Sequence, residues 1–461
     1  MVGRVRVRFV TPASKPSGGR TEPPANTHTF RHDRLAVVLP PSSRLRLLLK
    51  ALVACSVLAL AAVFAGPLSS GAVLLLLPAP QRAVEHDLPA DYTPLHKGHV
   101  SLDVGIYVRE NEDLVVPGTP ALVLRRTYIS GFRAAKEFGI ATTQAGEWYL
   151  VGDGKKFQWA ALIRPGEYRV RFERSSSGTS LLNAMYTHRS SADEWQDARL
   201  GWTGVGWALR QADGSLAQFR PCGPDVKDVC SIMRHRDADG HVINYRRTAA
   251  GRLERMEAGP NRWISFDYDD GNRVTRAFDS AKHEVRYEYD ERGRLARVKS
   301  GGAITHRYTY TDRDEMATII EPGTDIENTY DADGRCIRQV NRYADGSDPY
   351  IFDNAYKLDG SDVVQTDVRR SDGTWTQYMF NKIGFTTSET WGREDVEPAT
   401  FVYERDPVTN AVVSLNLSCP DRTGRQLRHS SLVKPGREEW IKWDLVRTHC
   451  SWTGRRWRTA G

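Results

Sequence analysis

The sequence predicts a mostly β protein whose central part is a stack of antiparallel hairpins. A tyrosine-led motif recurs at positions 268, 289, 310 and 330, in steps of 21, 21 and 20 residues. Aromatic and β-branched residues alternate with polar ones before each copy, as in Val285-Arg286-Tyr287-Glu288-Tyr289, which is typical of a strand with one apolar face. A fixed step of this length indicates one supersecondary unit stacked on copies of itself.

The first fifty residues are predicted to form a disordered basic leader. Residues 1–50 are rich in Arg, Pro, Ser and Thr and show no sustained periodicity, a composition that does not support a packed core. They carry a net charge of +8 and residues 421–461 carry +6, whereas the whole chain carries +7. The chain between the two ends is therefore net acidic, and we expect no nucleic acid as a partner.

A hydrophobic segment follows the leader and predicts export. Residues 51–77 contain no charged side chain, and a run of about 20 apolar residues spans a bilayer. Arg44, Arg46 and Lys50 precede it, which favours a cytoplasmic N-terminus. Two interpretations remain open. Either 51–77 is an uncleaved signal-anchor helix, or 51–65 is the core of a signal peptide that is cleaved after Ala65.

Both interpretations place the rest of the chain outside the cytoplasm. With an anchor, the protein is held on the inner membrane and faces the periplasm; with a cleaved signal, it is secreted or lies at the cell surface. Residues 78–98 contain several prolines and are predicted to be a linker. An N-terminal β domain is expected at 99–230, where Pro117-Gly118 separates two apolar stretches as a turn separates two strands.

The predicted export favours disulfides between the cysteines, because disulfides persist in oxidising compartments. Cys222 and Cys230 flank a Gly-Pro-Asp turn sequence, so we predict a disulfide across this loop. Cys419 and Cys450 could form a second bridge near the C-terminus, which would leave Cys336 as a free, buried residue of the repeats.

The repeat region is expected at 231–413. Each unit has a strand, a chain reversal at Asp or Asn with Gly, and a second short strand; Gly allows the positive φ that such reversals need. One hairpin alone is marginally stable, but stacked hairpins share an aromatic stripe. Weaker copies start at Tyr245, Tyr356, Tyr378 and Tyr403. The residues expected to form the repeat core are Tyr268, Gly271, Tyr289, Asp290, Gly293, Arg294, Leu295, Tyr310, Tyr330, Asp331, Gly334 and Arg335.

These motifs resemble those of the YD-repeat (Rhs) family. Residues 289–295 match its signature Tyr-Asp-x-x-Gly-Arg-Leu at each defined place. Arg126, Tyr128 and Ser130 are similar to the segment that opens Rhs proteins, and Phe138-Gly139 is similar to that domain's Phe-Gly element. In that family the repeats wind into a curved β-shell, often around a toxic cargo domain. The resemblance therefore implies a curved sheet or partial shell.

The toxin tip of that family is not expected in this chain. Rhs proteins end their shell with an Asp-Pro-x-Gly-Leu self-cleavage segment, whereas Asp406-Pro407 is followed here by Val408-Thr409. Residues 414–461 are instead predicted to form a basic C-terminal cap or tail with interleaved tryptophans.

Motifs for catalysis or metal binding are lacking in the sequence. It contains no Gly-x-Ser-x-Gly elbow, phosphate loop or His-Glu-x-x-His. The stretches Asp237–Gly240 and Asp331–Gly334 have the acidic start of a calcium loop but lack its distal Glu, so we interpret them as turns of the repeat. We therefore expect no catalytic residue, cofactor or metal.

The leading hypothesis is a non-enzymatic, membrane-tethered YD-repeat scaffold or binding protein of the cell envelope. Residues 51–77 would attach it to the membrane, and its aromatic-lined sheet would bind protein or carbohydrate. The alternative is an incomplete or orphan Rhs-type shell component of a toxin-delivery system. A glycan hydrolase on a β-scaffold is a third possibility; it would require two carboxylates about 5–10 Å apart in a cleft.

Overall fold

The computed structural model describes residues 99–152, 158–178, 180, 183–189, 195–222, 230–249, 251–394, 396–420 and 426–432. The predicted leader (1–50), hydrophobic segment (51–77) and linker (78–98) lie outside these ranges. The described part is mostly β and its elements are strands β1 to β30. The described residues contain no helix long and apolar enough to cross a membrane.

Eight consecutive strands close into a ring. Each pairs antiparallel with the next, and β13 returns to β6 through Cys230 opposite Leu150 and Ser231 opposite Tyr149. Large apolar side chains, among them Trp195 and Phe172, fill its core. The strands are β6 (Tyr149–Gly152), β7 (Trp159–Ile163), β8 (Arg169–Arg174), β9 (Met185–Thr187), β10 (Arg199–Trp202), β11 (Trp207–Arg210), β12 (Leu216–Phe219) and β13 (Cys230–Arg236).

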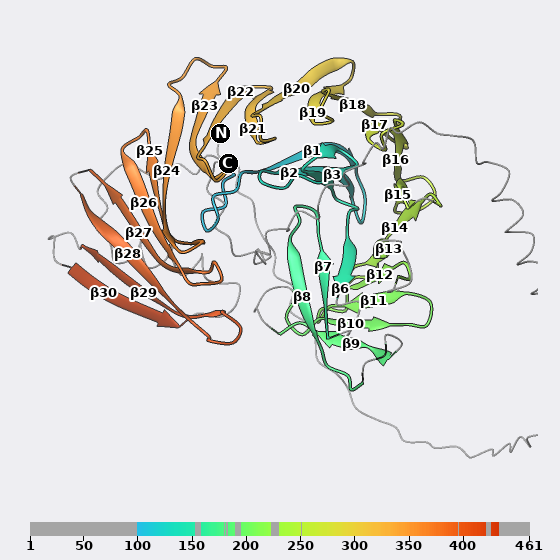
Figure 1. The fold of residues 1–461 in the computed structure, drawn as a ribbon, viewed down its shortest axis with the longest axis horizontal. Coiled ribbons are helices and arrows are strands. Elements are labelled where there is room, and N and C mark those ends of the chain that lie inside the picture. The colour runs from blue at the N-terminus through green and yellow to red at the C-terminus, as the bar shows by residue number, and fades with distance from the viewer. Residues whose placement is uncertain are drawn as a thin grey trace, which may run out of the picture. The chain divides into compact units, whose positions relative to one another are not determined.

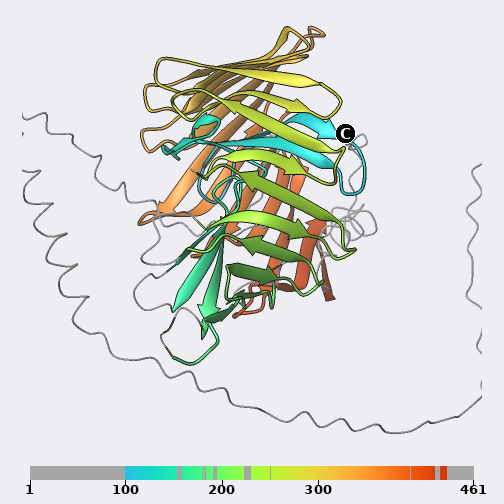
Figure 2. The same cartoon turned by 90° about the vertical axis from the view of Figure 1, so that its right-hand side faces the viewer.

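From β13 the chain continues as one long antiparallel sheet in which each strand pairs with its neighbours in sequence order (Figures 1 and 2). The ring and this sheet together comprise 25 strands. The strands after β13 are β14 (Val242–Arg247), β15 (Leu253–Glu257), β16 (Trp263–Tyr268), β17 (Val274–Asp279), β18 (Glu284–Tyr289), β19 (Leu295–Ser300), β20 (Ala303–Tyr310), β21 (Met316–Glu321), β22 (Thr324–Tyr330), β23 (Cys336–Tyr343), β24 (Tyr350–Asp359), β25 (Asp362–Arg370), β26 (Thr374–Phe380), β27 (Thr386–Arg393), β28 (Val396–Arg405), β29 (Val412–Pro420) and β30 (Gln426–Leu432).

Strand β13 belongs to both parts. Its first residues pair with β6, and on the same edge Arg234 and Arg236 pair with Asn244 and Val242 of β14. The other edge pairs with β12. One strand therefore closes the ring and starts the long sheet.

The segment before the ring packs against the long sheet. It contains β1 (Val108–Val116), β2 (Leu122–Ile129) and β5 (Thr142–Gln144), which form a three-stranded sheet, and the short pair β3 (Ala135–Lys136) and β4 (Gly139–Ile140). We call residues 99–147 the N-terminal segment. Its apolar side chains share one core with side chains from β15 to β26, and the long sheet bends around it (Figure 1). We call the sheet face in this core the inner face.

The expected domain bounds stay a prediction, and the packing of the described residues is as follows. Within 99–230, residues 99–147 contribute to the core of the long sheet, whereas residues from 149 onward enter the ring. At the other end, the sheet extends past 413 to Leu432. The alternation Leu415-Asn416-Leu417-Ser418-Cys419 explains the extension, since its apolar positions are buried. The rest of the expected tail, 433–461, lies outside the described residues.

Candidate binding surface: the inner face of the repeat sheet

Each repeat turn is closed by its aspartate. In the clearest copy, Asp290 accepts hydrogen bonds from the main-chain N–H of Arg294 at 2.9 Å and from its guanidinium Nε at 2.7 Å. Gly293 between them has φ of +82°, a conformation that favours Gly. Asp331 and Arg335 repeat the arrangement with Gly334 at +88°. The Asp-x-x-Gly-Arg pattern thus encodes the turn.

Gly271 does not take the place expected for the turn glycine. In its copy the third residue after Asp269 is Asn272, which has φ of +62°, and Arg273 bonds back to Asp269 as in the other copies. In the copy at 310 the same position is Asp314, with φ of +67°. In each copy the left-handed residue is the third after the residue that starts the turn, Asp269 or Thr311, and Asn and Asp tolerate this region better than other non-glycine residues.

The motif tyrosines connect neighbouring repeats. The Tyr289 hydroxyl donates to the Val274 carbonyl at 2.6 Å, and that of Tyr310 donates to the Leu295 carbonyl at 2.7 Å. Burial raises the pKa of the phenol of Tyr289, so it remains a neutral donor. The same bond recurs along the sheet, from Tyr268 to Leu253, from Tyr330 to Met316 and from Tyr356 to Cys336.

The motif arginines pack on the tyrosine of the next repeat. The Arg273 guanidinium lies 4.8 Å from the centre of the Tyr289 ring, and that of Arg294 lies 4.9 Å from the Tyr310 ring. Such cation–π contacts each contribute roughly 0.5–1 kcal/mol at exposed sites. Tyr, Asp, Gly and Arg of the motif are therefore all engaged in contacts that build the sheet.

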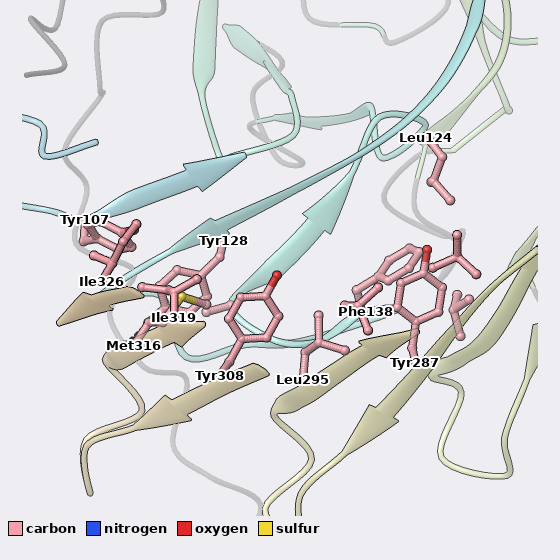
Figure 3. Close-up of a cluster of buried hydrophobic side chains, with 14 of the residues drawn as sticks. Tyr107, Leu124, Tyr128, Phe138, Tyr287, Leu295, Tyr308, Met316, Ile319 and Ile326 are labelled. Atoms are coloured by element: carbon pink, nitrogen blue, oxygen red, sulfur yellow. Dashed lines mark hydrogen bonds between the residues drawn. The ribbon is translucent and has the colours of Figure 1, made fainter. Parts of the chain in front are cut away.

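The N-terminal segment covers the inner face over these repeats. Phe138 packs edge-on against Tyr287 with ring centres 4.9 Å apart, and Tyr128 lies beside Met316 and Ile319 (Figure 3). A Cβ on Gly139 would lie 2.8 Å from the Gly293 carbonyl oxygen, so the segment touches the turn backbone. The aromatic stripe predicted as a ligand surface is thus packed against the protein's own chain.

Main-chain N–H groups at the bulges of three repeats donate hydrogen bonds to this segment. The N–H of Val274 donates to the Glu137 carbonyl at 2.7 Å, and that of Cys336 donates to the Gly105 carbonyl at 2.8 Å. Between them, the N–H of Met316 donates to the Tyr128 hydroxyl at 2.8 Å. Buried backbone donors need such partners, so the segment satisfies groups that the sheet leaves unpaired.

A buried ion pair lies inside this interface. The Arg126 guanidinium donates to Asp113 through Nε at 2.5 Å and Nη2 at 2.9 Å, and Tyr287 donates to the same carboxylate at 2.7 Å. Desolvation, the largest effect, lowers the pKa of the Arg126 guanidinium, but Asp113, Tyr308 and Tyr287 together raise it well above its usual value. Side-chain exposures of 4% and 2% make this a fully desolvated, paired charge. Arg126 is one of the residues similar to the opening segment of Rhs proteins, whereas Asp113 belongs to no motif in the sequence.

A second polar cluster lies near the start of the segment. Arg109 pairs with Glu321 and donates to Nε2 of His99 at 2.8 Å; His306 Nε2 lies 3.7 Å from the same Glu321. Burial, and then the positive charge of Arg109, lower the pKa of His99 to about 4. The pKa of His306 is also lowered, mainly by burial. Both imidazoles are therefore neutral at pH 7.

A third cluster connects the N-terminal segment to the ring. Lys136 Nζ lies 2.7 Å from Glu167 and 3.4 Å from Glu147, and Tyr149 donates to Glu167 at 3.1 Å. Burial raises the pKa of Glu147 to about 7, although Lys136 opposes the shift. Burial likewise raises the pKa of Tyr149 to about 12. The cluster holds Lys136 as a paired ammonium between β3 and the ring.

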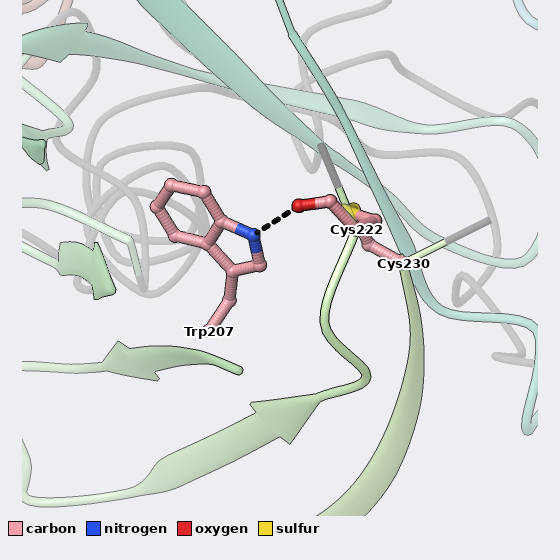
Figure 4. The surroundings of a disulfide bond; sticks show 3 residues. All are labelled: Trp207, Cys222 and Cys230. Carbon is pink, nitrogen blue, oxygen red and sulfur yellow. Dashed lines mark hydrogen bonds between the residues drawn. A yellow bond between two sulfur atoms is a disulfide. The ribbon is translucent and has the colours of Figure 1, made fainter. Parts of the chain in front are cut away.

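The structure joins Cys222 and Cys230 in a disulfide at the start of β13, and the Trp207 indole N–H donates to the Cys222 carbonyl at 3.5 Å (Figure 4). Cys336 is a free, buried thiol whose pKa burial raises to about 12. Cys419 is also disulfide-bonded; Cys450, the partner considered from the sequence, lies outside the described residues.

The described residues contain no group of three or more His, Cys, Asp or Glu that could hold a metal ion. In the stretch that resembles a calcium loop, Asp237 accepts hydrogen bonds from the main-chain N–H and ring Nδ1 of His241 at 2.8 and 2.9 Å. Its carboxylate closes the β13–β14 turn as Asp290 closes its own.

Comparisons with known proteins give no family. No family model matches the chain, and no curated protein matches it. Among solved structures, a TcdB2-TccC3 crystal structure without its hypervariable C-terminal region matches at 9% identity and TM-score 0.32, over 69% of this chain and 22% of that chain. A Photorhabdus luminescens Tc holotoxin pore matches at 10% identity and TM-score 0.26, over 73% and 20%. The chain thus spans about a fifth of these toxin chains.

Proposed function

We propose that this chain is an exported, membrane-tethered YD-repeat protein that acts as a non-enzymatic scaffold or binding protein of the cell envelope. The observation that carries the proposal is that the motif side chains and the inner face are engaged within the chain, as in the Tyr289–Val274 bond and the Phe138–Tyr287 contact. Side chains committed to packing and hydrogen bonding support a structural role rather than catalysis.

A partner would then meet the outer face of the sheet. This face carries paired charges of both signs, such as Arg276 with Glu284 at 2.8 Å and Arg338 with Asp353 at 2.6 Å. It also carries the ring pair of Trp263 and Phe278, 5.8 Å apart. Mixed charge beside aromatic rings suits a protein or carbohydrate ligand, whereas nucleic acid favours a continuous basic surface.

The alternative, an orphan shell component with a separate cargo, has less support. A cargo on the inner face over β15 to β26 would have to displace the N-terminal segment, which shares a core with those strands. Displacement would also leave the main-chain N–H groups of Val274 and Cys336 without their partners in that segment.

The export and the tether are tested with alkaline phosphatase fused after Gly461, since this reporter is active only outside the reducing cytoplasm. The full chain should give an active, membrane-bound fusion, and a variant lacking residues 51–77 should give an inactive one. An inactive full-length fusion would exclude the envelope location.

The ligand is sought by capture from native envelopes with residues 79–461. The capture by the wild-type protein is compared with that by the Trp263→Ala and Arg276→Glu variants. Equal capture by all three proteins would exclude the outer face as the binding surface.

A further inference from the structure

The inner face continues beyond the reach of the N-terminal segment. A separate apolar cluster lies on β28 and β29, with Trp391 and Tyr403 packed against it. Phe401 and Leu415 are 0% exposed, yet the cluster includes no residue of the N-terminal segment. The core that does include that segment ends at Phe380 of β26.

The two clusters lie on the same face of the sheet. Tyr378 of β26, which packs against the first core, is the cross-strand neighbour of Glu389 on β27. Glu389 is in turn opposite Phe401, and Phe401 is opposite Leu417. Directly paired residues point to the same side of a sheet, so this row of side chains passes from the covered part of the inner face to the second cluster.

A covalent link starts from the second cluster. Cys419 is 0% exposed, belongs to the cluster and is disulfide-bonded. Cys222 and Cys230 are bonded to each other, and Cys336 is free. Of the six cysteines in the chain, only Cys55 and Cys450 remain as partners.

We propose that residues 433–450 of this chain cover the inner face of β27 to β29 and are tied to it by a Cys419–Cys450 disulfide. Strand β30 ends at Leu432 and pairs directly with β29. The 18 residues to Cys450 can extend about 60 Å, whereas neighbouring strands are only about 4.8 Å apart. The segment also supplies apolar surface, in Trp440, Ile441, Trp443, Leu445 and Val446.

Charge adds little to this argument, because residues 433–450 contain four basic and three acidic side chains, and the carboxylate of Glu389 on this face already accepts hydrogen bonds from Trp391 and Tyr403. With this cover, the chain itself lines the inner face at both ends: the N-terminal segment up to β26 and residues 433–450 beyond it.

Peptide mapping of the full chain tests the disulfide. The protein is isolated from the envelope fraction, alkylated under denaturing conditions, and digested without reduction. A Cys419–Cys450 peptide is expected, alongside the Cys222–Cys230 peptide and an alkylated Cys336 as internal controls. A Cys419–Cys55 peptide, or alkylated Cys419 and Cys450, would overturn the proposal.

Hydrogen exchange tests the covering. A chain ending at residue 432 should show faster amide exchange in β28 and β29 and stronger binding of an apolar dye, whereas a matched chain ending at residue 454 keeps Cys450 and should behave as the wild type. The loss of Tm in the Cys419→Ser, Cys450→Ser double variant should be smaller than the sum of the two single losses, because both single changes remove the same bond. Additive losses would argue against the disulfide, and unchanged exchange in the chain ending at 432 would show that these residues do not cover the face.

Discussion

The hydroxyl of Tyr289 donates a hydrogen bond to the main-chain carbonyl of Val274, 2.6 Å away in the preceding repeat. The carbonyl belongs to the residue that follows the motif arginine, at the bulge where Tyr268 pairs with Val274. Because the N–H of Val274 bonds to the N-terminal segment, this one residue joins two repeats and the segment. The contact explains why tyrosine rather than phenylalanine starts the motif.

We predict that Tyr289→Phe lowers the free energy of unfolding by about 1–3 kcal/mol, because the change leaves a buried carbonyl without its donor while the ring packing is kept. Urea unfolding followed by tryptophan fluorescence measures the loss. Tyr343→Phe, at a residue 39% exposed, is the matched control and should change stability little. Equal effects of the two changes would contradict the structural role of the Tyr289 hydroxyl.

Two glycines of the repeats differ in backbone conformation, and only one of them has positive φ. Gly293 has φ of +82°, so Gly293→Ala should cost about 1 kcal/mol or more in unfolding free energy because L side chains are strained there. Gly271 precedes the left-handed position that Asn272 occupies, and Gly271→Ala should cost less than Gly293→Ala, because its Cβ would meet only the side chains of Asp269 and Arg273, at 3.2 and 3.3 Å. Thermal unfolding of both variants checks the difference. A larger loss for Gly271→Ala would mean that the turn position is wrongly identified.

The buried pair of Asp113 and Arg126 should matter more to stability than its exposed neighbour. Asp113→Asn leaves a buried guanidinium without its counter-charge, and the loss of one partner of a buried pair costs about 3–5 kcal/mol. Glu112 and Arg125 pair on the same two strands with exposures of 49% and 46%, so Glu112→Gln should cost under about 1 kcal/mol. Denaturant unfolding compares the two.

Proteolysis adds a spatial control to this prediction. Limited digestion of Asp113→Asn should open the N-terminal segment before the ring strands. Simultaneous cleavage throughout the described part would argue against a role of the pair in holding that segment.

Acid should weaken the contact at the start of the N-terminal segment. The pKa of His99 is lowered to about 4 by burial and by Arg109, with Glu321 opposing; His306 is the other titrating group in the cluster. Below pH 6.5 the unfolded chain binds a proton on His99 that the folded chain accepts only near pH 4. The unfolding free energy should therefore fall as the pH falls from 6.5 to 4, by at most about 3 kcal/mol from His99.

The measurement is the difference between the wild type and His99→Gln in urea unfolding at several pH values, in which other titrating groups cancel. His99→Gln keeps a polar side chain near Arg109 but does not titrate, so its stability should fall less between pH 6.5 and 4. Parallel curves for the two proteins would show that His99 does not titrate differently in the folded chain.

The local structure of the repeat could be predicted because it depends on nearby residues. Alternation identified the strands, and the Asp–Gly–Arg spacing identified the turns, since the Asp290 and Arg294 bond lies within five residues. Gly271 lies one place before the left-handed residue of its turn, because that residue is the third after Asp269. The Asp113–Arg126 pair and its contact with Tyr287 could not be inferred, because Tyr287 is 174 residues from Asp113.

The sequence by itself determined that this chain is a series of hairpins in sequence order, because periodicity, turn residues and spacing are properties of short stretches. Only the tertiary structure decided what the aromatic face contacts: Phe138 and Tyr128 of the chain's own N-terminal segment occupy it. The physical reason is that an apolar face specifies only that it must be buried. Which surface buries it depends on shape and on the backbone groups left unpaired at each bulge, and these exist only once the sheet has formed.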